Sequence, residues 1–309
     1  ACTRGTIDEA VAIDDIKKFI AEQDLHAETR FVPEVVIPSN VDKQWSEKIA
    51  IIGAGPAGLS CAYYLATKGY KPTVFEKNAR PGGMLTYGIP SYKLEKDVIE
   101  AEIDVLRELG VEIKCGVNVG TDVTIDELRK QGYKAFYVAI GCQGGRLPGV
   151  PGEDAIGTDM AVSFLHDATE NHDRKLVGKT VVIGGGNVAA DCAFTAAQNG
   201  AEQVEMFVRR RLSDMKISKT EYLELLYHQI NISPLCSPEK IEKRDDGLLL
   251  QTHRNRYDNG KTDPLPDSSV RLPGFALIIK AVGSYADDKI EDERIIYAGD
   301  CKTGGSKIV

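Results

Sequence analysis

Short apolar runs alternate with amphipathic stretches along most of the chain. Residues 49–52 form an unbroken apolar run of the kind that a buried parallel strand requires. A glycine-rich turn, a helix-compatible stretch over 59–68 and a strand over 72–76 follow directly. One amphipathic helix and two further strands are predicted next, over 94–109, 111–119 and 134–140. This alternation predicts an α/β fold built on parallel strands.

The same order of elements is repeated in the second half of the chain. A strand over 180–183 precedes a second glycine-rich turn. The elements after this turn are a helix and a strand, over 190–198 and 204–208. A helix is then predicted over 213–228, and residues 230–279 alternate short β-like runs with turn signals, notably at 258–260. Two copies of one unit, the second with an appended sheet, predict two Rossmann-like dinucleotide-binding domains.

The two ends of the chain lie outside these repeats. Residues 12–22 carry apolar side chains at helical spacing, which predicts a short amphipathic helix. Residues 31–41 are punctuated by prolines and are predicted to be an extended linker. A last strand is expected over 295–298, directly before Gly299 and Asp300. The best candidate for a domain boundary is the glycine- and proline-rich stretch 141–152.

The first glycine turn is the dinucleotide fingerprint Gly-x-Gly-x-x-Gly, placed between a strand and a helix. Gly53 allows the tight turn, Gly55 lets backbone approach a pyrophosphate, and Gly58 allows close packing of helix on strand. Glu76 ends the next strand, where a carboxylate accepts hydrogen bonds from ribose hydroxyls. A plain tight turn is the alternative, but the strand, helix and acid together favour cofactor binding.

The second turn is the Gly-x-Gly-x-x-Ala variant of the fingerprint. Its candidate cofactor-binding residues are Gly184, Gly186, Asn187, Val188 and Ala189. The strand that follows ends on three arginines rather than on an acid. Guanidinium groups suit a 2′-phosphate, so Arg209 and Arg210 indicate NADPH, although a basic surface cluster would have the same sequence.

Composition narrows the class of protein. The chain has 309 residues, a net charge of −8 and a pI near 5.3, which argues against nucleic acid and anionic membranes as main partners. Seven scattered cysteines without a Cys-x-x-Cys pair suit the cytosol and exclude a redox dithiol. No metal-ligand spacing is found, and no membrane span is expected. His166 and His172 are predicted to lie in a polar loop, and all five histidines to have structural or solvent roles.

Several motifs resemble one family of flavoproteins. They are the two fingerprints, the stretch 82–90, Ala139-Ile140-Gly141, the arginines followed by Met215, and Gly299-Asp300. Together they are similar to the small (beta) subunit of NADPH-dependent glutamate synthase and related FAD/NADPH oxidoreductases. The resemblance runs from Cys2 to the end and implies FAD on the first fingerprint and NADPH on the second.

The resemblance also implies domain limits and further site residues. It divides the chain into an N-terminal helical segment (1–46), an FAD domain (47–150), an inserted NADPH domain (151–288) and a return to the FAD domain (289–309). It places Gly83, Leu85, Leu94 and Val119 near FAD and Asp300 on the ribityl chain. The remaining FAD candidates are Pro56, Ala57, Lys77, Gly141 and Gly299. From the residues alone, Gly82 and Gly83 suit either a flat ligand or a surface turn.

The implied function is electron transfer. NADPH would give hydride to FAD, and electrons would pass to an iron–sulfur centre or to a partner, such as a larger catalytic subunit. Relatives hold iron–sulfur clusters in an upstream cysteine-rich region, of which this chain has only Cys2, so a cluster is expected only if that region is present. The alternative is a non-catalytic, nucleotide-binding assembly subunit of a redox complex.

Overall fold

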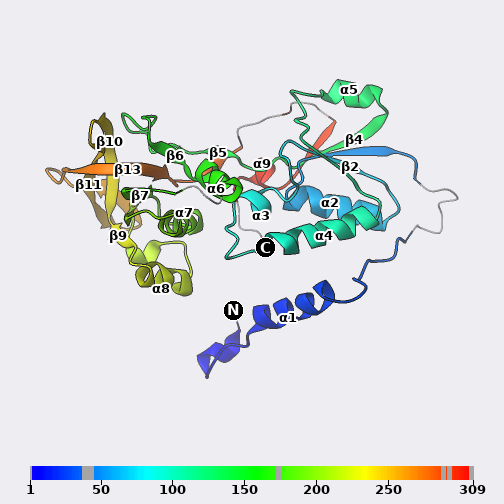
Figure 1. Ribbon diagram of the computed structural model, residues 1–309, viewed down its shortest axis with the longest axis horizontal. Coiled ribbons are helices and arrows are strands. Elements are labelled where there is room, and N and C mark those ends of the chain that lie inside the picture. The colour runs from blue at the N-terminus through cyan, green and yellow to red at the C-terminus, as the bar shows by residue number, and fades with distance from the viewer. Residues whose placement is uncertain (1, 37–44, 172–174, 287–289, 291–293, 306–309) are drawn as a thin grey trace.

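The computed structural model describes residues 2–36, 45–171, 175–286, 290 and 294–305. Two units lie side by side, each a β-sheet with helices packed on it (Figure 1). The first unit contains the first fingerprint and the second unit contains the second. The α/β fold expected from the sequence, with two Rossmann-like units, is therefore confirmed.

The first sheet is entirely parallel. Its strands are β1 (Lys48–Ile52), β2 (Thr73–Glu76), β3 (Glu112–Cys115), β4 (Tyr133–Val138) and β15 (Ile295–Tyr297). Their order across the sheet is β15-β4-β1-β2-β3, which is the doubly wound Rossmann order. Helices α2 (Pro56–Thr67), α4 (Lys96–Glu108) and α5 (Ile125–Lys130) accompany it. Apolar side chains fill both faces of the sheet, as a parallel sheet requires.

Strand β15 belongs to the first sheet although the whole second unit precedes it in the chain. It pairs with β4 in parallel, with Ile295 opposite Phe136 and Tyr297 opposite Val138. The turn Gly299-Asp300 and the four-residue helix α9 (Asp300–Thr303) follow it. The late strand therefore brings residues 299 and 300 to the carboxyl end of the first sheet, where the first fingerprint also lies.

The second sheet combines a parallel Rossmann half with an antiparallel half. The parallel strands are β7 (Lys179–Ile183), β8 (Gln203–Val208), β9 (Asn231–Pro234), β13 (Val270–Lys280) and β6 (Thr158–Met160). The antiparallel strands are β10 (Cys236–Arg244), β11 (Gly247–Asp258) and β12 (Lys261–Pro264). Helices α6 (Ala161–Glu170), α7 (Asn187–Gln198) and α8 (Lys219–Tyr227) complete the unit. Asn259 and Gly260 both have positive φ in the β11–β12 turn, which confirms the predicted hairpin.

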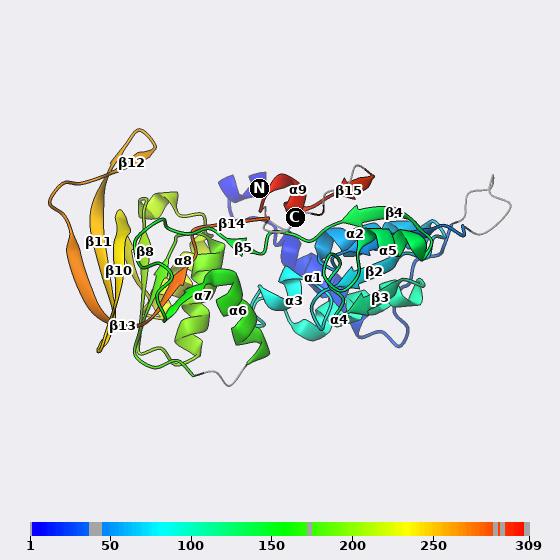
Figure 2. The same ribbon diagram turned by 90° about the horizontal axis from the view of Figure 1, so that it is seen from above.

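Two kinds of contact join the units. The chain crosses between them twice, and the crossings pair as a two-stranded ribbon of β5 (Gly144–Gly145) and β14 (Ser284–Tyr285) (Figure 2). Below it, the short helix α3 (Met84–Tyr87) faces α6, where Tyr87 stacks on His166 with ring centroids 4.7 Å apart. The domain boundaries at residues 150 and 288 stay a prediction.

An ion pair around the buried Asp191 adds a third contact between the units. Lys93 precedes α4 of the first unit, and its Nζ lies 2.5 Å from Oδ1 of Asp191 and 2.7 Å from Oε1 of Glu221, both in the second unit. Burial raises the pKa of Asp191. Its Oδ1 has no other hydrogen-bond partner of good geometry in the described part of the chain. The Lys93 ammonium is therefore what compensates this buried carboxylate.

Three details differ from the sequence-based expectations. The strand predicted over 111–119 ends at Cys115, because Gly116 follows with φ of 72°. The helix predicted over 213–228 is reduced to α8, since Ser218 caps its start by a capping box. A 3₁₀ turn, Leu212–Asp214, stands before it. His166 lies in helix α6, not in a polar loop; His172 is outside the described residues.

The N-terminal segment contains the predicted helix, α1 (Ile13–Leu25), which lies beside α4 (Figure 1). None of its residues is buried. Arg30 fastens the segment, because its guanidinium pairs with Asp24 at the end of α1 and with Glu102 of α4. The linker is without regular structure over 31–36, and its remaining residues 37–41 are outside the described part. No helix of the described chain is long and apolar enough to cross a membrane.

Candidate functional site

The first glycine turn places each of its glycines differently. Gly53 has φ of 101°, and a Cβ there would lie 2.4 Å from the carbonyl oxygen of Ala139. A Cβ on Gly58 would lie 1.9 Å from the carbonyl oxygen of Gly53. A Cβ on Gly55, by contrast, would meet only the Cα of Gly83, at 4.0 Å. Gly53 and Gly58 therefore let backbone pack on backbone, whereas Gly55 keeps open space in front of the turn.

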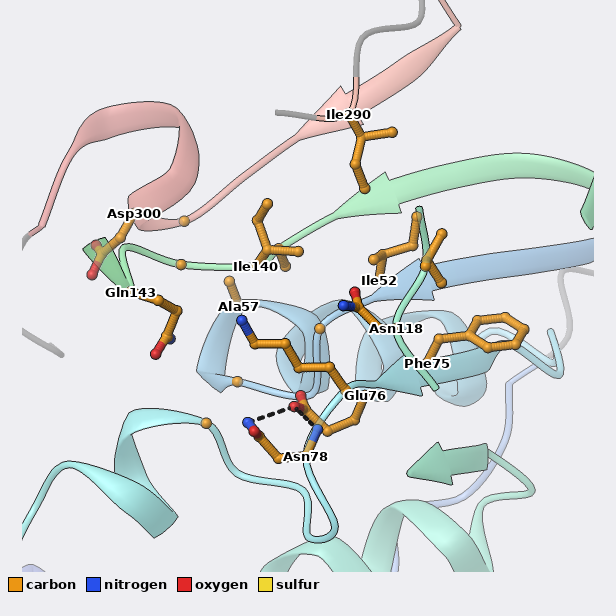
Figure 3. A pocket seen from close by; sticks show the side chains of 18 of the residues that line it. Ile52, Ala57, Phe75, Glu76, Asn78, Asn118, Ile140, Gln143, Ile290 and Asp300 are labelled. Carbon is orange, nitrogen blue, oxygen red and sulfur yellow. Dashed lines mark hydrogen bonds between the residues drawn. The ribbon is translucent and has the colours of Figure 1, made fainter. Parts of the chain in front are cut away.

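That open space is a cavity of about 560 Å³ at the carboxyl end of the first sheet (Figure 3). Its lining contains most of the residues expected near FAD, namely Gly53, Gly55, Pro56, Ala57, Glu76, Lys77, Gly83, Val119, Gly141, Gly299 and Asp300. These residues come from six separate stretches of the chain. Crevices at this end of a doubly wound sheet are where such folds bind ligands.

The helix behind the turn supplies the chemistry for an anion. Helix α2 begins at Pro56, directly at the cavity wall, and Gly55 precedes it in an extended conformation. The first N–H groups of a helix have no partner within it, and they carry the positive end of the helix dipole. A pyrophosphate in front of Gly55 would therefore find both donors and a favourable field.

Glu76 stands in the middle of the cavity wall and is almost completely buried. Its Oε2 accepts from the N–H of Ala54 at 2.8 Å, and its Oε1 accepts from the N–H and the side-chain amide of Asn78, both at 2.9 Å (Figure 3). These bonds hold the carboxylate in place. A carboxylate offers about four lone-pair positions, and three are used here, so there is room for one ribose hydroxyl as well.

Glu76 divides the cavity into two ends (Figure 3). Phe75 lies at one end, close to the loop 117–121 that follows β3. Asp300 and Gln143 lie at the other end (Figure 3). The cavity is thus elongated along the carboxyl edge of the sheet, as an extended dinucleotide requires.

Two glycine loops close the wall around the fingerprint. The N–H of Gly82 donates to the carbonyl oxygen of Ala54 at 2.8 Å, and a Cβ on Gly83 would lie 2.8 Å from the Cα of Gly55. Gly299 has φ of 66°, and its missing side chain leaves space for Ala57. The glycines at 82 and 83 therefore serve to bring one loop onto another, which neither sequence alternative had stated.

Three of the expected residues do not line the cavity. One is Gly58, which is buried in helix α2. Leu85 and Leu94 are half-buried nearby, and neither lines the cavity. The carbonyl oxygen of Leu85 accepts a hydrogen bond of 2.9 Å from Lys96, which fixes the segment after Gly83. The lining residues that sequence reasoning missed are chiefly Met84, Cys142, Gln143, Ile290 and the residues of the loop 117–121 other than Val119. Gly116 and Gly120 at the ends of that loop were the signal that a strand over 111–119 could not continue.

The second glycine turn repeats the geometry of the first. A Cβ on Gly184 would lie 2.3 Å from the carbonyl oxygen of Ala281, and a Cβ on Gly186 would meet nothing within 4 Å. Ala189 is fully buried behind the turn, whereas Asn187 and Val188 are exposed at the start of α7. The turn therefore presents a helix N-terminus and open space, as the first turn does.

The arginines after β8 lie beside this second turn but are not equivalent. Arg209 and Arg210 are exposed, and their guanidinium groups make no hydrogen bond or ion pair with the described residues. Arg211 binds Asp214 through two hydrogen bonds of 2.9 and 3.0 Å. This contact lowers the pKa of the Asp214 carboxyl. Only the first two arginines are thus available to an incoming anion.

Comparison with known proteins identifies the family of this fold. The model of the pyridine nucleotide-disulphide oxidoreductase family matches residues 47–295. The chain belongs to this family. In FprA of Mycobacterium tuberculosis, solved in complex with NADPH, the same architecture covers 85% of this chain and 80% of that one, with a TM-score of 0.71 at 18% identity. This member of the family thus has the fold expected from its motifs.

Sequence relatives confirm the resemblance to the glutamate synthase small subunit. The small chain of NADPH-dependent glutamate synthase from Escherichia coli is 34% identical, over 85% of this chain and 57% of that protein. The beta subunit of the NADP(+)-dependent formate dehydrogenase of Moorella thermoacetica is 35% identical, over 95% of this chain and 45% of that protein. The chain spans about half the length of these curated relatives. Both relatives are named as subunits or chains.

Proposed function

We propose that this chain is an electron-transfer module that binds FAD in the cavity of the first unit and NADPH at the second glycine turn. The observation that carries the proposal is that the two glycine turns match. In each turn the first glycine packs against backbone, and the next glycine of the fingerprint faces open space. Glu76 beside the first turn suits a ribose, and the exposed arginines beside the second suit a phosphate.

The residues around the cavity hold the flavin cofactor in one orientation. The start of α2 and Gly55 receive the pyrophosphate, and Glu76 accepts from the ribose of the adenosine half. Phe75 and Val119 would border the adenine end of FAD, while Asp300, Gly141 and Gly83 would hold the flavin end. When bound, FAD would supply the chemistry of this site, which is acceptance of a hydride from NADPH and onward release of single electrons.

The second unit holds the coenzyme. Gly184 and Gly186, with Asn187 and Val188 at the start of α7, receive its pyrophosphate, and Ala189 allows the helix to pack closely. Arg209 and Arg210 bind the 2′-phosphate and so select NADPH. Neither half of this scheme requires a side chain as general acid or base, because no proton must be moved by the protein to pass a hydride.

We place the boundaries of the FAD domain at 47–150 and 289–309 and those of the inserted coenzyme domain at 151–288. The electrons leave to a partner, which we propose to be a larger catalytic subunit or another acceptor protein in the cytoplasm. Support comes from the names of the relatives, which are subunits, and from the scattered cysteines. An iron–sulfur centre in an upstream region would be the first acceptor.

An anaerobic absorbance titration tests the proposal. The purified chain is reconstituted with FAD, and the visible flavin band is followed as NADPH is added. Bleaching in proportion to the added NADPH is the expected result. A chain that takes up no flavin, or that takes up flavin without bleaching, contradicts the proposal. The Gly186→Val variant is the matched control, because it should retain FAD and lose the response to NADPH.

A further inference from the structure

Strand β11, in the antiparallel half of the second sheet, contacts the arginine turn, which comprises residues 209–211. Asn255, on β11, is buried, and its side-chain amide donates to the carbonyl oxygen of Arg209 at 3.3 Å and to Oγ of Ser237 at 2.8 Å. The backbone of Arg209 is thus tied directly to a strand that is remote from it in sequence. Its side chain remains exposed and unpaired in the described structure.

The next arginine is held through the same asparagine. The carbonyl oxygen of Arg210 accepts from the N–H of Leu235 at 3.0 Å, and the carbonyl oxygen of Leu235 accepts from the N–H of Asn255 at 2.7 Å. Leu235 has φ of 53°, a conformation that non-glycine residues rarely adopt. The link between β9 and β10 is therefore bent so that it can bond the arginine turn on one side and β11 on the other.

The third arginine is held by its side chain. The guanidinium carbon of Arg211 lies 3.9 Å from the ring centroid of Tyr257, in cation–π contact, while Asp214 binds the same guanidinium with two hydrogen bonds. Tyr257 is two residues after Asn255 on β11, so both side chains leave the strand on the same face. One face of β11 thus contacts the turn at both of its ends.

These contacts assign different tasks to three adjacent arginines. Arg209 and Arg210 have fixed backbones and free guanidinium groups, which is the arrangement of a prepared binding site. Arg211 has its guanidinium engaged on both sides and cannot reach a ligand without giving up these contacts. The sequence Arg-Arg-Arg does not distinguish the three residues, whereas their surroundings do.

We propose that Asn255 and Tyr257 are positioning residues for coenzyme specificity. They hold the turn 209–211 so that Arg209 and Arg210 face the coenzyme phosphate. Arg211 supports the turn and does not contact the coenzyme. This rests on the proposed function, in which the second unit binds NADPH. In this proposal the antiparallel half of the sheet contributes to coenzyme choice, although no residue of β11 belongs to the glycine turn.

The effect should be confined to ligands that carry the 2′-phosphate. Loss of a whole charge-assisted contact changes affinity about 10- to 150-fold, so misplacing the two arginines should raise the KM for NADPH by about 5- to 30-fold. The value of kcat at saturating NADPH and both constants for NADH should stay close to those of the parent, because the glycine turn is untouched.

Four variants of the FAD-reconstituted chain test the proposal. Asn255→Asp keeps the shape of the side chain but removes its donor, and Tyr257→Leu removes the aromatic face. Tyr257→Phe keeps that face and should retain the parent's coenzyme preference. Arg256→Gln changes the exposed residue between the two, on the opposite face of β11, and should also leave the preference unchanged. Steady-state constants are measured with NADPH and NADH.

An equilibrium readout makes the result independent of the hydride step. Inhibition constants are measured for adenosine 2′,5′-bisphosphate and for AMP, which differ in the 2′-phosphate. The first constant should rise in Asn255→Asp and Tyr257→Leu while the second does not change. Equal changes for both inhibitors, or no change for either, would overturn the assignment. A parent chain that prefers neither NADPH nor the bisphosphate would instead refute the proposed function itself.

Discussion

Replacing Gly55 with valine should separate FAD binding from folding. The backbone there is extended, with φ of −77° and ψ of −179°, which a β-branched residue adopts readily. A Cβ would have its nearest neighbour 4.0 Å away, at ordinary contact distance. The apoprotein of Gly55→Val should therefore fold, with the new methyl groups projecting into the cavity where the pyrophosphate would lie.

The size of the effect follows from the donors that the pyrophosphate would lose. Each charge-assisted hydrogen bond contributes roughly 1.5–3 kcal/mol, so displacing the phosphates from two N–H groups should weaken FAD binding by about 10²- to 10⁴-fold. Gly58→Ala provides the contrast, because its Cβ would lie 1.9 Å from the carbonyl oxygen of Gly53. That substitution forces backbone apart and should damage the fold as well as the site.

The assay is titration of apoprotein with FAD, followed by quenching of flavin fluorescence, with thermal unfolding of each apoprotein measured beside it. Gly55→Val is expected to unfold near the parent's temperature and to bind FAD poorly, whereas Gly58→Ala is expected to lose stability. A valine variant that retains FAD at the parent's stoichiometry would show that the pyrophosphate does not lie against Gly55. A valine variant that unfolds as readily as Gly58→Ala would show that the open space is misjudged.

Three further predictions concern charge and thiol chemistry. Arg209→Glu should reduce the preference for NADPH over NADH by about 10- to 150-fold, since one charge-assisted contact is lost. If the ratio of kcat/KM for NADPH to that for NADH is unchanged, this arginine does not bind the coenzyme. Lys93→Met should destabilise the chain by about 3 kcal/mol in urea unfolding, because it strands a buried carboxylate, and adding Asp191→Asn should recover much of that. Because burial raises the pKa of Asp191, this carboxyl protonates more readily in the folded state. The loss of stability in Lys93→Met should therefore shrink as pH falls. A loss of stability that does not change with pH would contradict the role given to Lys93. Hydrogen bonds from backbone N–H groups, chiefly that of Val11, lower the pKa of Cys2, whereas burial raises the pKa of Cys61 to about 11. Mass spectrometry after brief alkylation at neutral pH should therefore find label on Cys2 well before Cys61.

The two Rossmann units were predictable because their signals are local. The apolar run before Gly53, the helix behind it and the acid at position 76 stand within thirty residues, roughly one βαβ unit. Gly53 and Gly58 were expected to allow a tight turn and close packing, and a side chain at either position would clash with backbone. The elements that carry both fingerprints were therefore found close to their observed limits.

What the sequence did not reveal depends on contacts between remote segments. The loop 117–121 enters the cavity because Gly116 turns the chain out of the sheet, but apolar residues on both sides of that glycine suggested a continuous strand. The segment before α8 is extended because Lys216 pairs with Gly186, a contact that no helical pattern encodes. Arg211 and Arg209 look alike in sequence, since the tyrosine and asparagine that distinguish them arrive about fifty residues later.

Because β15 follows the second unit in the chain, the two units complete their folds at different times during synthesis. The ribosome adds roughly 5–20 residues per second, so the second unit emerges before the edge strand of the first sheet does. Until then β4 offers an open edge to other nascent chains, which is a hazard for aggregation. Gly299 and Asp300 emerge only after that strand, so the flavin end of the cavity stays unfinished until then. Arrested nascent chains that end before residue 295 should therefore retain coenzyme better than flavin.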